Sequence, residues 1–196
     1  MIRPAREGDR DALMRMWKRC FPQDTDRFIR FYFDHVHAND EALVYEVNGQ
    51  PAASLQMIPY RLKIGGAISQ GGYISGAMTH PDHRKKGYMS QLLQASFDEM
   101  IKKGCDYTFL IPQEQWLIGM YEKYGFRLCE PSRQPPENKV LKSPRQMALI
   151  QQLFWEENGI RMEEESPVPN ERKGMIKRLN PDAKEITALY MGMMLE

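Results

Sequence analysis

The stretch from Gly76 to Leu93 combines a strand end, a basic turn and a helix start, an arrangement suited to binding an anion. It reads Gly-Ala-Met-Thr-His-Pro-Asp-His-Arg-Lys-Lys-Gly-Tyr-Met-Ser-Gln-Leu-Leu. The first N–H groups of a helix have no acceptor within it and lie at the positive end of its dipole. Gly87 lets a phosphate approach the backbone closely, and Arg84 to Lys86 add positive charge. We predict a phosphate-binding turn here; a solvated basic turn is the alternative on charge alone.

A second candidate element runs from Gly119 to Phe126, with the sequence Gly-Met-Tyr-Glu-Lys-Tyr-Gly-Phe. A short helix would present Tyr121 and end at Gly125. A phenol with a pKa of ~10 can act as a proton donor. The alternative is that these aromatic residues pack a helix onto a sheet, which suits Tyr124 and Phe126.

Two amphipathic helices are predicted before residue 37. Apolar residues between Ala12 and Phe21 fall on one helical stripe, with Asp9 as the expected cap and Pro22 as the stop. A second, aromatic-rich helix follows, capped by Thr25 or Asp26. Its excess of aromatic residues indicates a wide buried face or, alternatively, a wall of a substrate groove.

Three antiparallel strands are predicted next, over Leu43–Val47, Ala52–Ile64 and Ala67–Thr79. The turns between them are Asn48-Gly49, a strong hairpin signal, and Gly65-Gly66. The third strand also contains glycines, which indicate a bulge or a close approach of a ligand or another backbone. These glycines are Gly71, Gly72 and Gly76.

A helix marked by apolar residues between Met89 and Ile101, ended near Gly104, leads to a buried strand over Tyr107–Ile111. Strand, helix and strand in this order indicate a right-handed parallel crossover. A short helix over residues 115–124 and a strand over Phe126–Cys129 complete a mixed α/β fold. The expected architecture is a central mixed sheet with antiparallel N-terminal strands and a parallel crossover, flanked by helices.

The composition changes after residue 130, so we predict a domain over 1–130 and a C-terminal extension over 131–196. The extension opens with a proline-rich linker at 131–136. A capping box with proline at the first helical position predicts a helix over 143–159. A strand is expected over Met175–Leu179, and the apolar tail at 186–195 could be helix or strand.

The two chemical elements together resemble the GNAT superfamily of acetyl-CoA-dependent N-acetyltransferases. The family signature Arg/Gln-x-x-Gly-x-Gly/Ala corresponds to residues 84–89, and its later Tyr-x-x-x-Gly-Phe element to residues 121–126. The resemblance covers about residues 1–130. It implies an acyltransferase that moves an acetyl group from acetyl-CoA, as cosubstrate, to a primary amine.

By this resemblance, backbone groups at the end of the third strand would bind the pantetheine arm. The N–H groups of the turn would hold the pyrophosphate, and the basic side chains could reach the 3′-phosphate. The implied acetyl-CoA-binding residues are Ala77, Met78, Thr79, Arg84, Lys85, Lys86, Gly87, Tyr88, Met89 and Ser90. The sequence departs from the family twice, since Met89 replaces a small residue and Glu114 stands where many members carry Asn.

The implied reaction is direct attack of the amine on the thioester, with Tyr121 as proton donor to the leaving thiolate. A backbone N–H at Met78 or Thr79 could stabilise the oxyanion. The base is open, with Glu114 and the terminal carboxylate of Glu196 as candidates. The acceptor is expected to be a small-molecule or peptide amine, and the extension could mediate a homodimer or cover the substrate groove.

Composition weighs against other classes of function. The chain has 196 residues, 42% hydrophobic, and a formal net charge of +1, which argues against a nucleic-acid or membrane-surface binder. No apolar stretch approaches the ~20 residues of a membrane-spanning helix. A metal could be suggested by His80 and His83 with Asp82, or by His35 with His37. No metal is expected, because Pro81 forces an extended turn and a catalytic zinc site needs three well-placed ligands. Three cysteines without close spacing indicate free thiols and a cytoplasmic location.

Two rival functions are left open by the sequence. A catalytically silent acyl-CoA-binding module is the main alternative, and it would account for Met89 and Glu114 as signs of lost activity. A nucleic-acid-binding domain using Arg84 to Lys86 and exposed tyrosines is the other, and the near-neutral charge argues against it.

Overall fold

A computed structural model of the chain describes residues 1–129, 138–141 and 174–189. The chain divides into two compact units. The first contains Met1–Pro59 and Tyr73–Lys103, and the second contains Tyr60–Gly72 and the chain from Gly104 onward. The fold is mixed α/β, as predicted, and its two long strands β3 (Gln50–Ile64) and β4 (Ala67–Thr79) contribute to both units.

In the first unit the strand order is β1-β2-β3-β4. Strand β2 (Ala42–Val47) pairs antiparallel with β3, and the short β1 (Ile2–Pro4) pairs antiparallel with the other edge of β2. The sequence pattern did not predict β1, because three residues are too few to show a period of two. Its central residue Arg3 is buried and holds both carboxylate oxygens of Asp9, at 2.6 and 2.9 Å.

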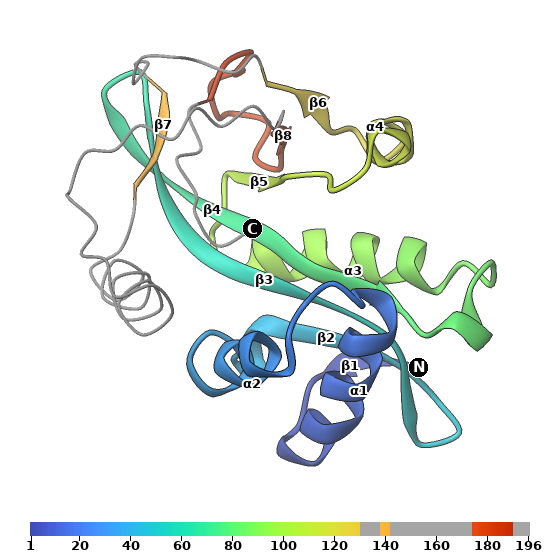
Figure 1. Cartoon of the computed structure of the whole chain (residues 1–196). Coiled ribbons are helices and arrows are strands. Elements are labelled where there is room, and N and C mark those ends of the chain that lie inside the picture. Colours follow the sequence, from blue (N-terminus) through green and yellow to red (C-terminus); the bar gives the residue numbers. More distant parts are fainter. Residues whose placement is uncertain (130–137, 142–173, 190–196) are drawn as a thin grey trace. The chain divides into compact units, whose positions relative to one another are not determined.

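Helices cover both faces of these strands (Figure 1). Helices α1 (Arg10–Cys20) and α2 (Asp26–His35) share a buried cluster with Val44, whereas Tyr45 stacks on Tyr88 of α3 (Tyr88–Lys102). Because neighbouring strand residues point to opposite faces, α1 and α2 cover one face and α3 covers the other.

Of the two predicted helix caps, only one makes a side-chain hydrogen bond to its helix. The hydroxyl of Thr25 accepts a hydrogen bond from the N–H of Phe28 at 3.1 Å, so Thr25 caps α2 as expected. Asp9 precedes α1, but its side chain makes no capping bond to that helix. Its carboxylate instead accepts from Arg3 and from the N–H of Arg6. Asp9 thus stands at the predicted N-cap position of α1, but a charged partner on β1 outcompetes the helix N–H groups for its carboxylate.

Strand β4 contains a bulge. Counted from the two-residue turn, Ala52 lies twelve positions from Ile64, the last residue of β3. His80 lies thirteen positions from Ala67, the first residue of β4, and yet its N–H bonds to the carbonyl of Ala52. Gly76 has φ +54°, and a Cβ built there would lie 2.7 Å from the Trp17 ring. Gly76 therefore combines the predicted bulge with a close approach of an aromatic ring.

In the second unit, β5 (Tyr107–Leu110) runs parallel to β4. The N–H of Asp106 donates to the carbonyl of Gln70 at 2.9 Å, and the Thr108 hydroxyl donates to the carbonyl of Gly72 at 3.0 Å. From the first bond to the second, the residue number rises on both strands, so the strands are parallel. This is the direction that the predicted crossover requires.

Strand β8 (Met175–Arg178) lies between β5 and β6 (Arg127–Leu128) and is antiparallel to both. The predicted strands at both positions are confirmed, but their pairing joins segments far apart in the sequence. Strand β7 (Lys139–Leu141) pairs antiparallel with β3, and α4 (Gln115–Glu122) follows β5.

Several sequence predictions lie outside the described residues, namely the linker at 131–136, the helix at 143–159 and the end of the apolar tail from residue 190. The described start of that tail is not helical, and its Ile186 and Leu189 side chains are buried.

Candidate functional site

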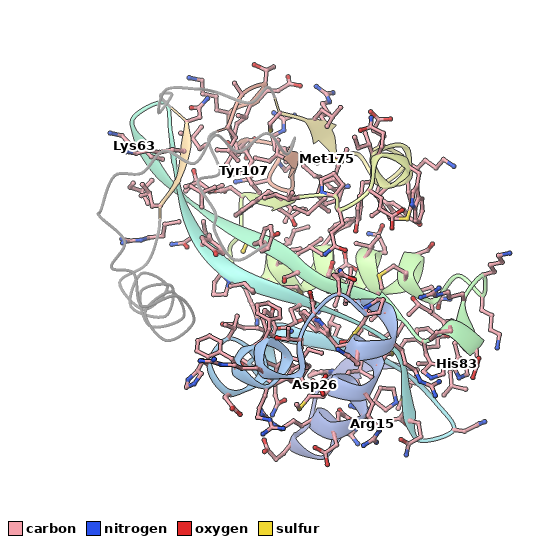
Figure 2. The ribbon with its side chains drawn as sticks, viewed as in Figure 1. Arg15, Asp26, Lys63, His83, Tyr107 and Met175 are labelled. Carbon is pink, nitrogen blue, oxygen red and sulfur yellow. The ribbon has the colours of Figure 1, made fainter. Side chains whose placement is uncertain are left out.

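The turn between β4 and α3 has the backbone of an anion-binding site. A short 3-10 turn, Pro81–His83, leads from β4 into it, and His83 is labelled in Figure 2. Lys85 has φ +61°, and Gly87 precedes α3 in the left-handed region with φ +76°. The first i→i−4 bond of the helix runs from Gln91 to Gly87 at 3.2 Å. The N–H groups before Gln91 thus lie ahead of the helical ladder, at the positive end of the dipole.

The side chains around this turn favour the binding of a negatively charged ligand. The first turn of α3 contains no acidic residue, and Arg84, Lys85 and Lys86 are exposed. A Cβ added at Gly87 would meet nothing within 4 Å, so the backbone is accessible there. An open, basic and carboxylate-free helix start fits a phosphate-bearing ligand.

Two of the basic side chains also support the turn itself. Arg84 donates from Nε to the carbonyl of Thr79 at 3.3 Å, and Lys86 donates from Nζ to the carbonyl of Asp82 at 3.1 Å. The thiol of Cys20 donates to the same Thr79 carbonyl at 3.3 Å, and burial raises the pKa of that thiol. The end of β4 is therefore tied both to the turn and to α1.

The other predicted residues of this segment differ in how far they are buried. Met78 is buried in the cluster under α1 and α2, whereas Ala77 and Met89 are half-buried. Tyr88 stacks almost parallel on Tyr45 of β2, with 4.0 Å between ring centroids. This stack fixes the start of α3 on the sheet, and no local pattern predicts it because the two tyrosines lie 43 positions apart.

Tyr121 belongs to the second unit, on α4. Its side chain is buried and meets Phe126 in a near-perpendicular ring contact, with centroids 5.6 Å apart. Gly125 has φ +83° and ends this segment. The carbonyl of the neighbouring Tyr124 accepts a 2.5 Å hydrogen bond from Lys177 of β8, and burial lowers the pKa of that lysine. Tyr121 is thus held rigidly, as a positioned proton donor or a packing residue would be.

Of the two candidate bases, only Glu114 lies among the described residues. Glu114 is exposed immediately before α4, and its carboxylate accepts the indole N–H of Trp116 at 2.5 Å. It makes no side-chain capping bond to the helix. Glu196, the other candidate, lies outside the described residues.

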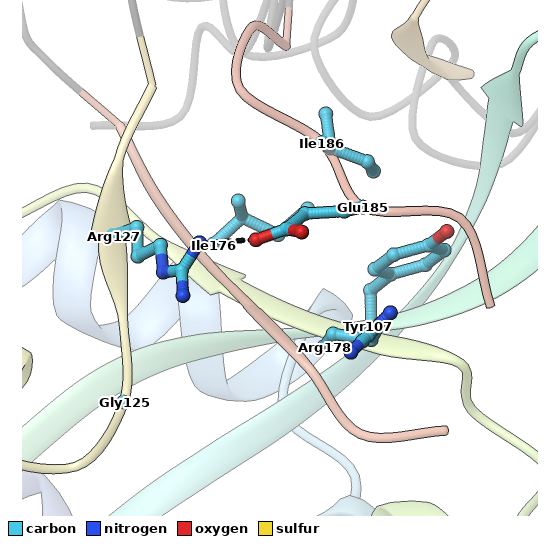
Figure 3. A pocket seen from close by; sticks show the side chains of 7 residues that line it. All are labelled: Tyr107, Gly125, Arg127, Ile176, Arg178, Glu185 and Ile186. Carbon is cyan, nitrogen blue, oxygen red and sulfur yellow. Dashed lines mark hydrogen bonds and ion pairs between the residues drawn. The ribbon is translucent and has the colours of Figure 1, made fainter. Parts of the chain in front are cut away.

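The second unit also contains a cavity of about 180 Å³ (Figure 3). An ion pair between Arg127 and Glu185 spans it, and the hydroxyl of Tyr107 donates to the carbonyl of Lys184 at 2.7 Å. None of the predicted site residues lines it. The lining residues are Tyr107, Gly125, Arg127, Ile176, Arg178, Glu185 and Ile186.

Two further findings concern the described residues only. No three histidine, cysteine, aspartate or glutamate side chains in the described part of the chain come together as a metal site would require. In the same part of the chain, none of the helices has the length and apolar character needed to cross a bilayer.

Comparison with known proteins gives the class. Residues 1–129 match the family model described as an acetyltransferase (GNAT) domain, so the chain belongs to the GNAT acetyltransferase family. No curated protein matches the sequence significantly.

Solved structures share the fold. The GNAT family N-acetyltransferase YhbS from Escherichia coli, in complex with CoA, is 17% identical, with a TM-score of 0.60 over 97% of this chain and 88% of that one. A GNAT family acetyltransferase from Brucella melitensis, in complex with acetyl-CoA, is 17% identical, with a TM-score of 0.56 over 74% and 96%. A GCN5-related N-acetyltransferase from Anabaena variabilis is 19% identical, with a TM-score of 0.59 over 66% and 32%.

This chain spans about a third of the length of three similar structures, including the one from Anabaena variabilis.

Proposed function

We propose that this chain is an N-acetyltransferase that moves the acetyl group of acetyl-CoA to a primary amine by direct attack. The start of α3 carries the proposal. Gly87 opens the helix in the left-handed conformation, no carboxylate lies in the first turn, and three exposed basic residues precede it. These features fit the diphosphate of coenzyme A.

The chain's own residues would act in three ways. N–H groups of residues 85–90 hold the diphosphate, and the backbone of Ala77 to Thr79 aligns the pantetheine arm. Acetyl-CoA supplies an activated acyl group, which the neutral amine attacks. Tyr121 returns a proton to the departing thiolate, whose basicity is close to that of a phenol.

The test is acetyl transfer itself. The protein is incubated with acetyl-CoA and a panel of primary amines, here butane-1,4-diamine, lysinamide, glycinamide and tyramine. Free thiol is followed over time, and products are identified by mass. We expect amine-dependent thiol release together with a singly acetylated product. Binding of acetyl-CoA without product from any amine would contradict the proposal.

That contrary outcome is the result expected of the second candidate, a catalytically silent acyl-CoA-binding module. One observation favours it, because Glu114 places a carboxylate before α4 where the family resemblance has Asn. A melting temperature raised by acetyl-CoA, without any transfer, would identify such a module.

A further inference from the structure

The cavity of the second unit lies on one face of the strands β5, β8 and β6 (Figure 3). In the register of these strands, Tyr107 is paired with Arg178, and Arg127 is paired with Ile176. Ile176 and Arg178 lie two positions apart on β8, so all four side chains belong to the same face of the sheet. The register therefore brings a phenol, an apolar side chain and two guanidinium groups together from three separate segments of the chain.

The segment 183–186 is fixed over this face by hydrogen bonds to its backbone. The hydroxyl of Tyr107 donates to the carbonyl of Lys184 at 2.7 Å, and Nη1 of Arg178 donates to the carbonyl of Ala183 at 3.0 Å. Backbone acceptors cannot move without the segment, so these bonds hold it in place. The cavity between the strands and this segment therefore has defined walls on both sides.

The two arginines of the cavity differ in their partners. Arg127 forms an ion pair with the carboxylate of Glu185. Arg178 uses an N–H group for the carbonyl of Ala183, and no carboxylate among the described residues forms an ion pair with it. A guanidinium presents paired N–H donors that match the two oxygens of a carboxylate. Arg178 is thus the group of this cavity to which an external carboxylate can bind.

The rest of the lining determines the charge of a suitable ligand. The charged side chains around the cavity are two arginines and one glutamate, which leave one positive charge in excess. Burial raises the pKa of Tyr107, although Arg178 acts in the opposite direction, so the phenol stays neutral at neutral pH. A ligand with a single negative charge therefore neutralises the cavity, whereas a second charge would have no partner.

The size and apolar part of the lining determine the rest of the ligand. Ile176 and Ile186 are only 4% and 6% exposed, and both line the cavity. They offer an apolar surface beside the guanidinium, which suits a hydrocarbon chain and does not suit a free phosphate. The volume of about 180 Å³ is below the roughly 300 to 1,000 Å³ of pockets for drug-sized molecules, so the ligand is small.

We propose that this cavity binds a small aliphatic monocarboxylate, whose carboxylate pairs with Arg178 and whose hydrocarbon chain lies against Ile176 and Ile186. Glu185 competes with the ligand, because its carboxylate repels a second one in the same cavity. None of the residues assigned to acetyl-CoA binding or to proton donation lines the cavity. The proposal therefore goes beyond the N-acetyltransferase function and does not depend on it.

Isovalerate is the probe that tests the site. The isotope-labelled full chain is titrated with isovalerate, and its backbone amide signals are followed by NMR. We expect a Kd on the order of 1 mM, with the largest shifts at residues 176–178 and 183–186. Isovaleramide has the same shape without the charge, and inorganic phosphate has charge without the hydrocarbon chain. Both should bind at least about 10-fold more weakly than isovalerate.

Three variants locate the binding energy. Arg178→Gln should weaken isovalerate binding about 10-fold, whereas Arg61→Gln, at an exposed arginine of β3 outside the lining, should leave it unchanged. Glu185→Gln should strengthen binding about threefold, because it removes the competing carboxylate. A gain of affinity separates this role from a merely structural one, since loss of an ion pair that only supports the fold would not improve binding.

Several results would overturn the site. They are equal affinities for isovalerate and isovaleramide, phosphate binding as tight as that of isovalerate, largest shifts elsewhere in the chain, and unchanged affinity in Arg178→Gln. Weaker binding in Glu185→Gln would equally contradict the competition. Because these measurements need neither acetyl-CoA nor an amine, their failure leaves the N-acetyltransferase proposal standing, and failure of every amine leaves the carboxylate site standing.

Discussion

Helices α3 and α4 begin in opposite electrostatic settings, although both follow a strand of the sheet. The start of α3 has a left-handed glycine, exposed basic residues and no carboxylate in its first turn. The residue before α4 is Glu114 in an extended conformation, and its carboxylate binds the Trp116 indole. Local side chains therefore make the start of α3 favourable for an anion and the start of α4 unfavourable, although both present the positive end of a helix dipole.

Placing a carboxylate at the start of α3 should make its electrostatic setting similar to that of α4. Gly87→Asp is expected to weaken acetyl-CoA binding about 100-fold, since it puts a negative charge among the N–H donors. Gly87→Asn is the control, because Asn tolerates the left-handed region equally well and the position is sterically open. Calorimetric Kd values for the two variants give the comparison. Equal affinities would contradict an anion site at this turn.

On α4, the role proposed for Tyr121 concerns turnover rather than binding. Tyr121→Phe should lower kcat about 30-fold, because water replaces a positioned phenol as proton donor, while the Kd for acetyl-CoA stays within about twofold. Steady-state rates and calorimetry measure the two quantities. Tyr124→Phe, three residues further along, should change neither. An unaltered kcat in Tyr121→Phe would assign that side chain to packing alone.

Removing positive charge from the turn should have a smaller effect than adding a negative one. The double variant Lys85→Gln and Lys86→Gln is expected to bind acetyl-CoA about 10-fold more weakly and with a shallower dependence on salt. Lys102→Gln with Lys103→Gln makes the same change of charge at the opposite end of α3. If both pairs weaken binding equally, the overall charge of the protein is responsible and the turn is not.

The smallest expected effect comes from removing the carboxylate before α4. Glu114→Asn removes the carboxylate and supplies a favourable N-cap residue, so we expect acetyl-CoA to bind about threefold more tightly and the helix to gain about 1 kcal/mol. Glu122→Gln removes a charge at the far end of α4 and should leave affinity unchanged. Weaker binding in Glu114→Asn would show that the carboxylate contributes a contact of its own.

Local patterns in the sequence predicted most of the elements. Helices α1 to α4, the antiparallel strands and the crossover all follow from periodicities and turn residues that neighbouring positions share. The failures involve distant partners. Strand β1 is too short for a pattern, and the bonds of the Asp9 carboxylate to Arg3, which replace a side-chain capping bond, could not be recognised. The position of β8 between β5 and β6 likewise depends on pairing that no local signal encodes.

In the candidate site, too, local features were predicted from the sequence and contacts between distant residues were not. The turn at residues 84–90 is contiguous, so residue types alone identified it, and the structure adds the left-handed backbone at Lys85 and Gly87. The stack of Tyr45 on Tyr88 joins a strand and a helix that are far apart in the sequence. Such a contact becomes recognisable only when the packing of α3 on the sheet is known.

Because β8 is inserted between β5 and β6, the sheet of the second unit includes residues beyond 1–129, the part of the chain that matches the family model. A fragment ending at residue 129 would retain β5 and β6 but lose the strand that bonds to both. Each would present a ladder of bare amide and carbonyl groups, the usual template for aggregation. During synthesis both edges stay unpaired until residues 175–178 have been made, so this sheet is completed only after β5, β6 and the chain between β6 and β8.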